Sequence, residues 1–217
     1  MCGLDCADFD EGLATPLLEQ LVQDLRAALP AVLGQLPLSQ AWAYKYDTAS
    51  APDGIGIHAD AAAVNLNLWL TDDSANLESD EEDDDGAAQA EGVGSGRQRR
   101  RGGGGLVVWR KEPPSEQWDF EGFNSADAAT QAALLAFVQQ HDEDDGGGGG
   151  SSSGGSNGDG KEDEDGGGGA RPVHVPYQCN RMTLFKSTLL HRTEPGANFR
   201  KGHRNRRVNL TLLFGGP

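Results

Sequence analysis

The chain has 217 residues, which suits one domain of ordinary size with a hydrophobic core of its own. Its formal net charge of -16 and its 31 glycines are far from average usage, but both excesses are local. Residues 72–104 hold ten acids and four arginines, and residues 142–169 hold nine acids and one lysine, so these two segments carry -14 of the total charge. The acidity therefore says little about the partners of the folded part.

Cysteine usage and hydropathy indicate the cellular compartment of the protein. Cys2, Cys6 and Cys179 form neither a disulfide framework nor a zinc signature, which favours a reducing compartment. No run of about 18 apolar residues is present, and residues 1–12 are acidic rather than charged-then-apolar as in a signal peptide. We therefore expect a soluble, intracellular protein, in the cytoplasm rather than the nucleus, that binds no membrane.

The N-terminal part predicts a helix followed by two strands. Residues 13–36 have leucines at helical spacing, with Thr15 as the N-cap and a proline at the first helical position, and Pro30 should end or bend the helix. From Trp42 to Tyr46 aromatic residues alternate with others, which is typical of a strand. After the turn-forming residues 50–54, residues 55–60 predict a second strand.

Residues 63–71 predict a third strand, in which alternate side chains share a face. One face carries Asn65, Asn67 and Trp69, and the other carries Val64, Leu66, Leu68 and Leu70.

The remaining elements continue the same plan. Residues 106–109 predict a strand, and residues 125–141 predict a second helix with Ser125 as its cap. Three more strands are predicted at residues 173–178, 182–187 and 207–214.

The order of these elements predicts a single domain over residues 1–217, with a barrel core at about 41–214. The segments 72–104 and 142–169 cannot bury enough apolar surface to order themselves, so we expect two disordered, low-complexity inserts. Without them, one or two helices and at least seven short strands remain. This composition favours a mostly β protein with flanking helices, built as an antiparallel sandwich or barrel.

A candidate metal site lies in the predicted strands. His58 and Asp60 are separated by one residue, so on a strand their side chains point the same way. With His191, which follows a later strand, they provide the two histidines and one carboxylate of the facial triad of non-haem iron(II) oxygenases. Each residue alone has a simpler interpretation: a hydrogen-bonded strand histidine, a turn-forming aspartate and a loop histidine.

A candidate anion site lies at the start of the last strand. Arg206 and Arg207 open this apolar segment, and a buried arginine is costly unless its charge meets an anion. Both could instead be exposed at a strand end. Arg207 is the preferred candidate because it shares a face with the polar residues Asn209 and Thr211.

Taken together, the motifs resemble the 2-oxoglutarate/iron(II) dioxygenase superfamily, and most of all its prolyl 4-hydroxylase-like branch. The resemblance runs through a Gly-x-x-x-His-x-Asp segment, a glycine-led Leu-Val-Val-Trp strand, Arg-Met-Thr-Leu-Phe-Lys-Ser followed by Leu-His, and Arg-Val-Asn-Leu-Thr-Leu-Leu-Phe. It covers roughly residues 42–214 apart from the inserts. The loop between His191 and Arg207 is longer here than in the prolyl hydroxylases, which leaves Arg206 as the alternative.

The resemblance implies a double-stranded β-helix, a jelly-roll or cupin-like barrel. It implies that His58, Asp60 and His191 bind iron(II) and form the catalytic centre, and that Arg207 pairs with the distal carboxylate of 2-oxoglutarate. The other residues implied for the co-substrate pocket are Tyr46, Asn65, Asn67 and Trp69, with Tyr44 as a further candidate.

The implied activity is hydroxylation of a C–H bond by O2, with decarboxylation of 2-oxoglutarate to succinate and stimulation by ascorbate. The substrate is not readable from the sequence; a protein or peptide side chain is favoured over a small molecule. The alternatives are a cupin-like barrel that does not use 2-oxoglutarate, or an inactive barrel that binds metal or other proteins. The short arginine cluster at 97–101 lies beside a longer acidic block, so we do not expect a nucleic-acid partner, and the oligomeric state stays open.

Overall fold

The computed structural model describes residues 4–8, 12–46, 54–77, 103–113, 124–140 and 171–216. Most of the two predicted inserts, the arginine cluster and most of the turn at 50–54 lie outside these ranges. The first residues of the predicted first insert belong to the described part of the chain. Residues 73–75 form a short 3-10 helix, η2 (Asp73–Ala75), and Asn76 pairs with Phe199 in an isolated β-bridge.

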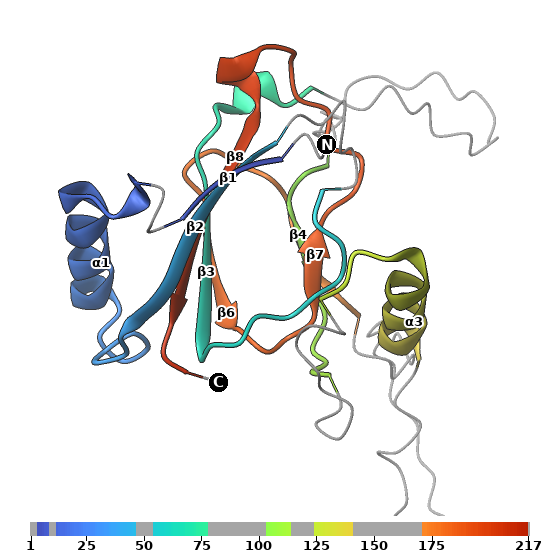
Figure 1. The fold of residues 1–217 in the computed structure, drawn as a ribbon, viewed down its shortest axis with the longest axis horizontal. Helices are drawn as coiled ribbons and strands as arrows, with labels where there is room; N and C mark the ends of the chain where they lie inside the picture. The colour runs from blue at the N-terminus through green and yellow to red at the C-terminus, as the bar shows by residue number, and fades with distance from the viewer. Residues whose placement is uncertain are drawn as a thin grey trace, which may run out of the picture.

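The described strands form two antiparallel sheets, which face each other in Figure 1. The larger sheet has the order β1 (Leu4–Asp8), β2 (Leu38–Tyr46), β8 (Arg207–Phe214), β3 (Val64–Trp69) and β6 (Met182–Lys186). The smaller sheet has the order β5 (Val173–Val175), β4 (Leu106–Val108) and β7 (His191–Thr193). The predicted mostly β architecture is confirmed, and β1 and β7 are strands that the sequence pattern did not predict.

The first helix, α1 (Pro16–Ala28), begins as predicted and ends earlier. Thr15 accepts a hydrogen bond from the Leu18 N–H through its hydroxyl oxygen at 3.3 Å. The predicted extent of 13–36 is wrong because Pro30 has no N–H group and disfavours helical geometry at Leu29, which adopts φ -127° and ψ 54°. Residues 30–35 form turns instead.

The second helix, α3 (Ala128–Gln139), is capped by Asp127 rather than by Ser125. One carboxylate oxygen of Asp127 accepts hydrogen bonds from the N–H groups of Ala129 and Thr130, at 3.0 and 2.9 Å. A carboxylate also interacts favourably with the positive end of the helix dipole. Ser125 instead donates to the other carboxylate oxygen of Asp127, so it supports the cap without being the cap.

Each helix covers the outer face of one sheet (Figure 1). The core beneath α1 consists of Leu18, Val22, Leu25, Leu33, Ala41, Leu66, Leu210, Leu212 and Phe214. The core beneath α3 consists of Ile57, Ala59, Val107, Trp109, Leu134, Val138 and Leu190. Among the described residues, no helix is both long and apolar enough to cross a bilayer.

The inner face of the larger sheet is polar, as the alternation in β3 and β8 predicts. Tyr46 lies opposite Arg207 across the β2–β8 pair, and Tyr44 lies opposite Asn209. Residues directly opposite in an antiparallel pair share a face. Asn65, Asn67, Arg207, Asn209 and Thr211 are all buried on this face. The sheets therefore enclose polar side chains where a purely structural sandwich would place apolar ones.

The predicted strand at 55–60 is not a regular strand. Its β pairing with the rest of the described chain consists of a single isolated bridge, between His58 and His191. The segment is nevertheless extended enough for His58 and Asp60 to face one way, while Ile57 and Ala59 pack into the core beneath α3.

The core beneath α1 should be the main source of stability. Leu66 lies in the middle of β3 and is 0% exposed, so Leu66→Ala should lower the free energy of unfolding by about 2–5 kcal/mol. Leu70→Ala is the control because Leu70 is 44% exposed, and it should change stability by less than about 0.5 kcal/mol. Urea unfolding followed by circular dichroism measures both; equal effects would contradict this packing.

Candidate metal centre

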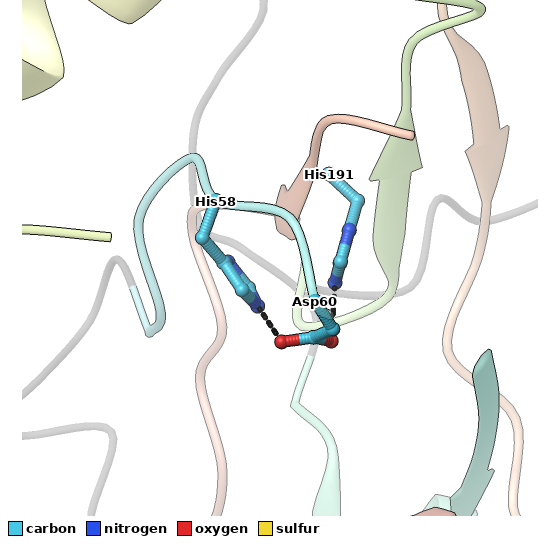
Figure 2. A group of neighbouring side chains, drawn as sticks. All are labelled: His58, Asp60 and His191. Carbon is cyan, nitrogen blue, oxygen red and sulfur yellow. Dashed lines mark ion pairs between the residues drawn. The ribbon is translucent and has the colours of Figure 1, made fainter. Parts of the chain in front are cut away.

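Three side chains from two distant parts of the chain converge at one point, as Figure 2 shows. His58 Nε2 lies 4.0 Å from Asp60 Oδ1, and His191 Nε2 lies 3.5 Å from Asp60 Oδ2. Each residue offers one ligand atom such that all three atoms lie within 4.8 Å of one another. Among the residues that the structure describes, this is the one group of three or more such side chains.

Backbone hydrogen bonds bring the three residues together. His58 and His191 exchange two of them, at 3.0 and 2.8 Å, as partners in an antiparallel ladder do. The Asp60 N–H donates to the Ser187 carbonyl at 3.1 Å, which ties the same segment to the end of β6. The predicted convergence of His58 and Asp60 with His191 is therefore present in the structure.

Both histidines are oriented by a carbonyl two residues earlier. His58 Nδ1 lies 2.8 Å from the Gly56 carbonyl oxygen, and His191 Nδ1 lies 2.8 Å from the Leu189 carbonyl oxygen. Because a carbonyl oxygen can only accept, each Nδ1 carries the proton in these contacts and each Nε2 has its lone pair free in the neutral ring. This is how a protein usually fixes the tautomer and orientation of a metal-binding histidine.

The electrostatics favour the protonation states that a metal requires. Burial, reinforced by the neighbouring His191, lowers the pKa of His58 to about 4, although Asp60 acts in the opposite direction. Burial tends to raise the pKa of Asp60, but the proximity of His191 and His58 and the hydrogen bond from the Asn65 amide outweigh it, so the pKa is lowered. At neutral pH His58 is therefore neutral and Asp60 ionised, as metal binding demands.

A cavity of about 330 Å³ adjoins the triad. It reaches Arg207 on β8, and its walls include Trp42 and Tyr44 from β2. Of the other residues that we predicted for a co-substrate pocket, Asn67 and Trp69 line the cavity, whereas Tyr46 and Asn65 lie behind its surface.

Arg207 is a buried cation held by neutral groups. It is 3% exposed, and its Nε donates to the Gly104 carbonyl at 2.7 Å. The guanidinium lies over the rings of Tyr46 and Tyr177, 4.8 and 5.9 Å from their centroids. No acidic side chain in the described part of the chain forms an ion pair with it, so its charge lacks the anion that a buried arginine normally meets.

The choice between the two arginines is geometric. Arg207 shares the inner face with Asn209 and Thr211 and lines the cavity, whereas Arg206 is half-buried and is not part of the cavity wall. The alternation along β8 placed Arg207 on this face correctly.

A chain of amide side chains runs from the triad along the inner face. Asn65 donates to Asp60 Oδ2 at 2.6 Å, Asn67 donates to Asn65 Oδ1 at 2.7 Å, and Asn209 donates to Asn67 Oδ1 at 2.7 Å. Asn65 is therefore placed to hold the Asp60 carboxylate rather than to contact a bound molecule.

Two features of the site gave no signal that sequence reasoning used. Tyr177 lies between β5 and β6 and places its ring beneath Arg207, while its hydroxyl donates to the Thr71 carbonyl at 2.5 Å. Gly104 supplies the carbonyl that holds Arg207 and adopts a φ of +93°, which a residue with a side chain rarely adopts. The run of glycines before β4 indicates a turn, but it does not indicate that a carbonyl of this turn accepts a hydrogen bond from Arg207.

Comparisons with known proteins do not assign the chain to a family. No protein-family model and no curated protein sequence matches the chain. Among solved structures, the chain is similar to the non-heme alpha ketoglutarate dependent epimerase SnoN from nogalamycin biosynthesis, with 14% identity and a TM-score of 0.46. The similarity covers 98% of this chain, which spans 63% of the length of the epimerase chain. At this level the likeness carries no argument, and the functional interpretation depends on the side chains that line the cavity.

The triad predicts binding of one divalent ion per chain. Calorimetric titration of metal-free protein with iron(II) under anaerobic conditions, or with cobalt(II), should show this stoichiometry. Asp60→Ala should weaken binding by more than about 100-fold, because even residues that only support a ligand typically contribute 10- to 100-fold. His174→Ala is the control, since the His174 side chain is exposed and in the described part of the chain pairs with Glu194, away from the triad. Equal affinities for the wild type and the Asp60 variant would contradict the metal centre.

Proposed function

We propose that the protein is an iron(II)- and 2-oxoglutarate-dependent oxygenase with a double-stranded β-helix fold, and that it hydroxylates a C–H bond. One observation carries the proposal: the His-Asp-His group and a buried arginine without an acidic partner in the described chain line the same cavity. The first binds a metal, and the second binds an anion beside it.

The donor set fits iron(II). Two imidazole nitrogens and one carboxylate oxygen on one side of an ion form a facial triad, which leaves coordination positions open for a co-substrate and oxygen. His58, Asp60 and His191 would hold the ion, and their Nε2 atoms and carboxylate already face a common point.

The far end of the cavity fits a carboxylate. A guanidinium matches a carboxylate in geometry and charge, and Arg207 is held in place by Gly104 and two aromatic rings. The Tyr46 hydroxyl, behind the cavity wall, is buried and has no hydrogen-bond partner among the described residues. Tyr177 differs, because its hydroxyl already has a partner, and burial raises its pKa to about 12, so that it stays a neutral phenol.

A dicarboxylate co-substrate would join the two ends of the cavity. When bound, iron(II) supplies the activation of O2 that couples decarboxylation of 2-oxoglutarate, giving succinate and CO2, to insertion of the second oxygen atom into a C–H bond. The chain's own residues do the rest. The triad fixes the ion, Arg207 fixes the orientation of the co-substrate, and the walls formed by Trp42 and Tyr44 limit the access of water.

The size of the cavity supports a substrate that enters only in part. About 330 Å³ has to hold the co-substrate and the reacting group together, which favours a side chain of a protein or peptide over a large rigid molecule.

Turnover of 2-oxoglutarate tests the proposal directly. Purified protein with iron(II), ascorbate and 2-oxoglutarate should form succinate, and Asp60→Ala should form none above background. In a lysate treated with active protein, mass spectrometry should find products heavier by one oxygen that the Asp60 variant does not form. Succinate formed without any product heavier by one oxygen would contradict hydroxylation. If no succinate forms even when peptides and small molecules from the lysate are present, the use of 2-oxoglutarate is contradicted.

Arg207 gives a second, sharper test. Arg207→Lys keeps the charge but loses the planar fork and its contacts with Tyr46 and Tyr177, so KM for 2-oxoglutarate should rise about 10-fold or more, the effect of one charge-assisted hydrogen bond. Arg206→Lys makes the same change one residue away, outside the cavity, and should alter KM less than about twofold. The assignment of Arg207 to the co-substrate fails if the two variants have the same KM for 2-oxoglutarate. The metal affinity should be unchanged in both variants.

A further inference from the structure

Among the described residues, the segment 57–60, which carries His58 and Asp60, has a backbone neighbour on one edge only. The even-numbered residues face that edge, where His58 pairs with His191 and the Asp60 N–H donates to Ser187. In an extended segment the odd-numbered residues direct their N–H and C=O groups to the other edge. Unpaired, the backbone groups of Ile57 and Ala59 would be costly where they are buried.

Two side-chain amides occupy that second edge in place of a strand. Gln131 accepts from the Ile57 N–H through Oε1 at 2.7 Å and donates to the Ile57 carbonyl through Nε2 at 3.0 Å. Asn124 accepts from the Ala59 N–H through Oδ1 at 3.3 Å and donates to the Ala59 carbonyl through Nδ2 at 2.9 Å. A carboxamide has the donor and acceptor of a peptide group, so each pairs with a residue as an antiparallel neighbour would.

This arrangement is closely fitted to the site. Gln131 Nε2 also donates to the Ser125 carbonyl at 3.0 Å, which anchors the loop before α3. A Cβ atom on Gly56 would lie 2.4 Å from Gln131 Oε1, so a glycine is needed for the amide to approach. The side chains of Ile57 and Ala59 pack into the core beneath α3, next to Leu134. Helix α3 is thus joined to the ligand-bearing segment by both polar and apolar contacts.

We propose that Gln131 and Asn124 are positioning residues of the metal centre. They act through the backbone of residues 57–60 and set the spacing of His58 and Asp60 from His191 before an ion binds. The inference rests on the proposed function only in that the triad binds a divalent metal. Without the two amides, the backbone bonds to His191 and Ser187 alone would hold the segment, and it could tilt about that edge.

The test replaces the amide without changing its size. In Gln131→Glu, a carboxylate cannot donate to the carbonyls of Ile57 and Ser125, and it repels both. The control is Gln139→Glu, the same change at an exposed position of the same helix. With cobalt(II) as the probe, the dissociation constant of Gln131→Glu should rise about 10- to 100-fold, and the visible absorption of bound cobalt should shift. The control should keep the affinity and the spectrum of the wild type.

A second variant and a measurement on the unaltered protein cover the case in which Gln131→Glu does not fold. Asn124→Asp lies outside the helix and should weaken cobalt binding in the same direction. In metal-free wild type, amide hydrogen exchange should show protection at both Ile57 and Ala59. Folded variants with the affinity and spectrum of the wild type would overturn the proposal, and so would unprotected amides at both positions. Failure of the wild type to bind cobalt would overturn the metal centre instead, and the exchange measurement would still decide whether the amides hold the segment.

Discussion

The two backbone hydrogen bonds between His58 and His191 are the constraint on which the site depends. They join the segment that follows β2 to β7 in the smaller sheet, and the next bond, from Asp60 to Ser187, joins the same segment to the end of β6 in the larger sheet. The ligand-bearing segment therefore crosses from one sheet to the other. These bonds explain how side chains so far apart in sequence can meet at one point. An ion placed there would be held by residues tied to both sheets.

The rest of the inner face shows what such a site costs in stability. A sandwich of this size would be more stable with apolar residues between its sheets, yet β3 and β8 place Asn65, Asn67, Asn209 and Thr211 there. The amides offset the cost of burial by bonding one another in a chain that ends on Asp60. The charge of Arg207 is not offset in this way: a carbonyl oxygen accepts from it and two rings lie beside it, but no acidic side chain of the described residues pairs with it. Groups retained at a cost to folding are best explained by what they bind.

Much of this arrangement could be predicted from the sequence, because it follows from alternation along strands. The parity of residues in β3 and β8 placed the asparagines and Arg207 on the inner face and Leu66 and Leu210 in the core, as the structure has them. The shared direction of His58 and Asp60 was predictable for a related reason. Residues 57–60 keep the alternation of a strand, although among the described residues they form a single isolated β-bridge, between His58 and His191. The strand itself was predicted wrongly because its second neighbour consists of side chains.

What the sequence could not show are contacts that leave no periodic pattern. Gln131 is one of several polar residues on α3, and its pairing with Ile57 depends on where the helix packs. Tyr177 is isolated between two short strands, and its contact with Arg207 depends on how the loop after β5 packs against β8 of the other sheet. The end of α1 at Ala28 agrees with the expectation that Pro30 ends or bends the helix, whereas the wider range 13–36 extended the helix beyond that proline.

A crystal structure obtained without oxygen, with manganese(II) in place of iron and with 2-oxoglutarate, tests the central claim most directly. We predict one ion bound by Nε2 of His58, Nε2 of His191 and a carboxylate oxygen of Asp60, and a 2-oxoglutarate whose distal carboxylate meets the guanidinium of Arg207. An ion bound elsewhere, a His191 ring turned away from it, or a co-substrate whose distal carboxylate does not reach Arg207 would contradict this claim.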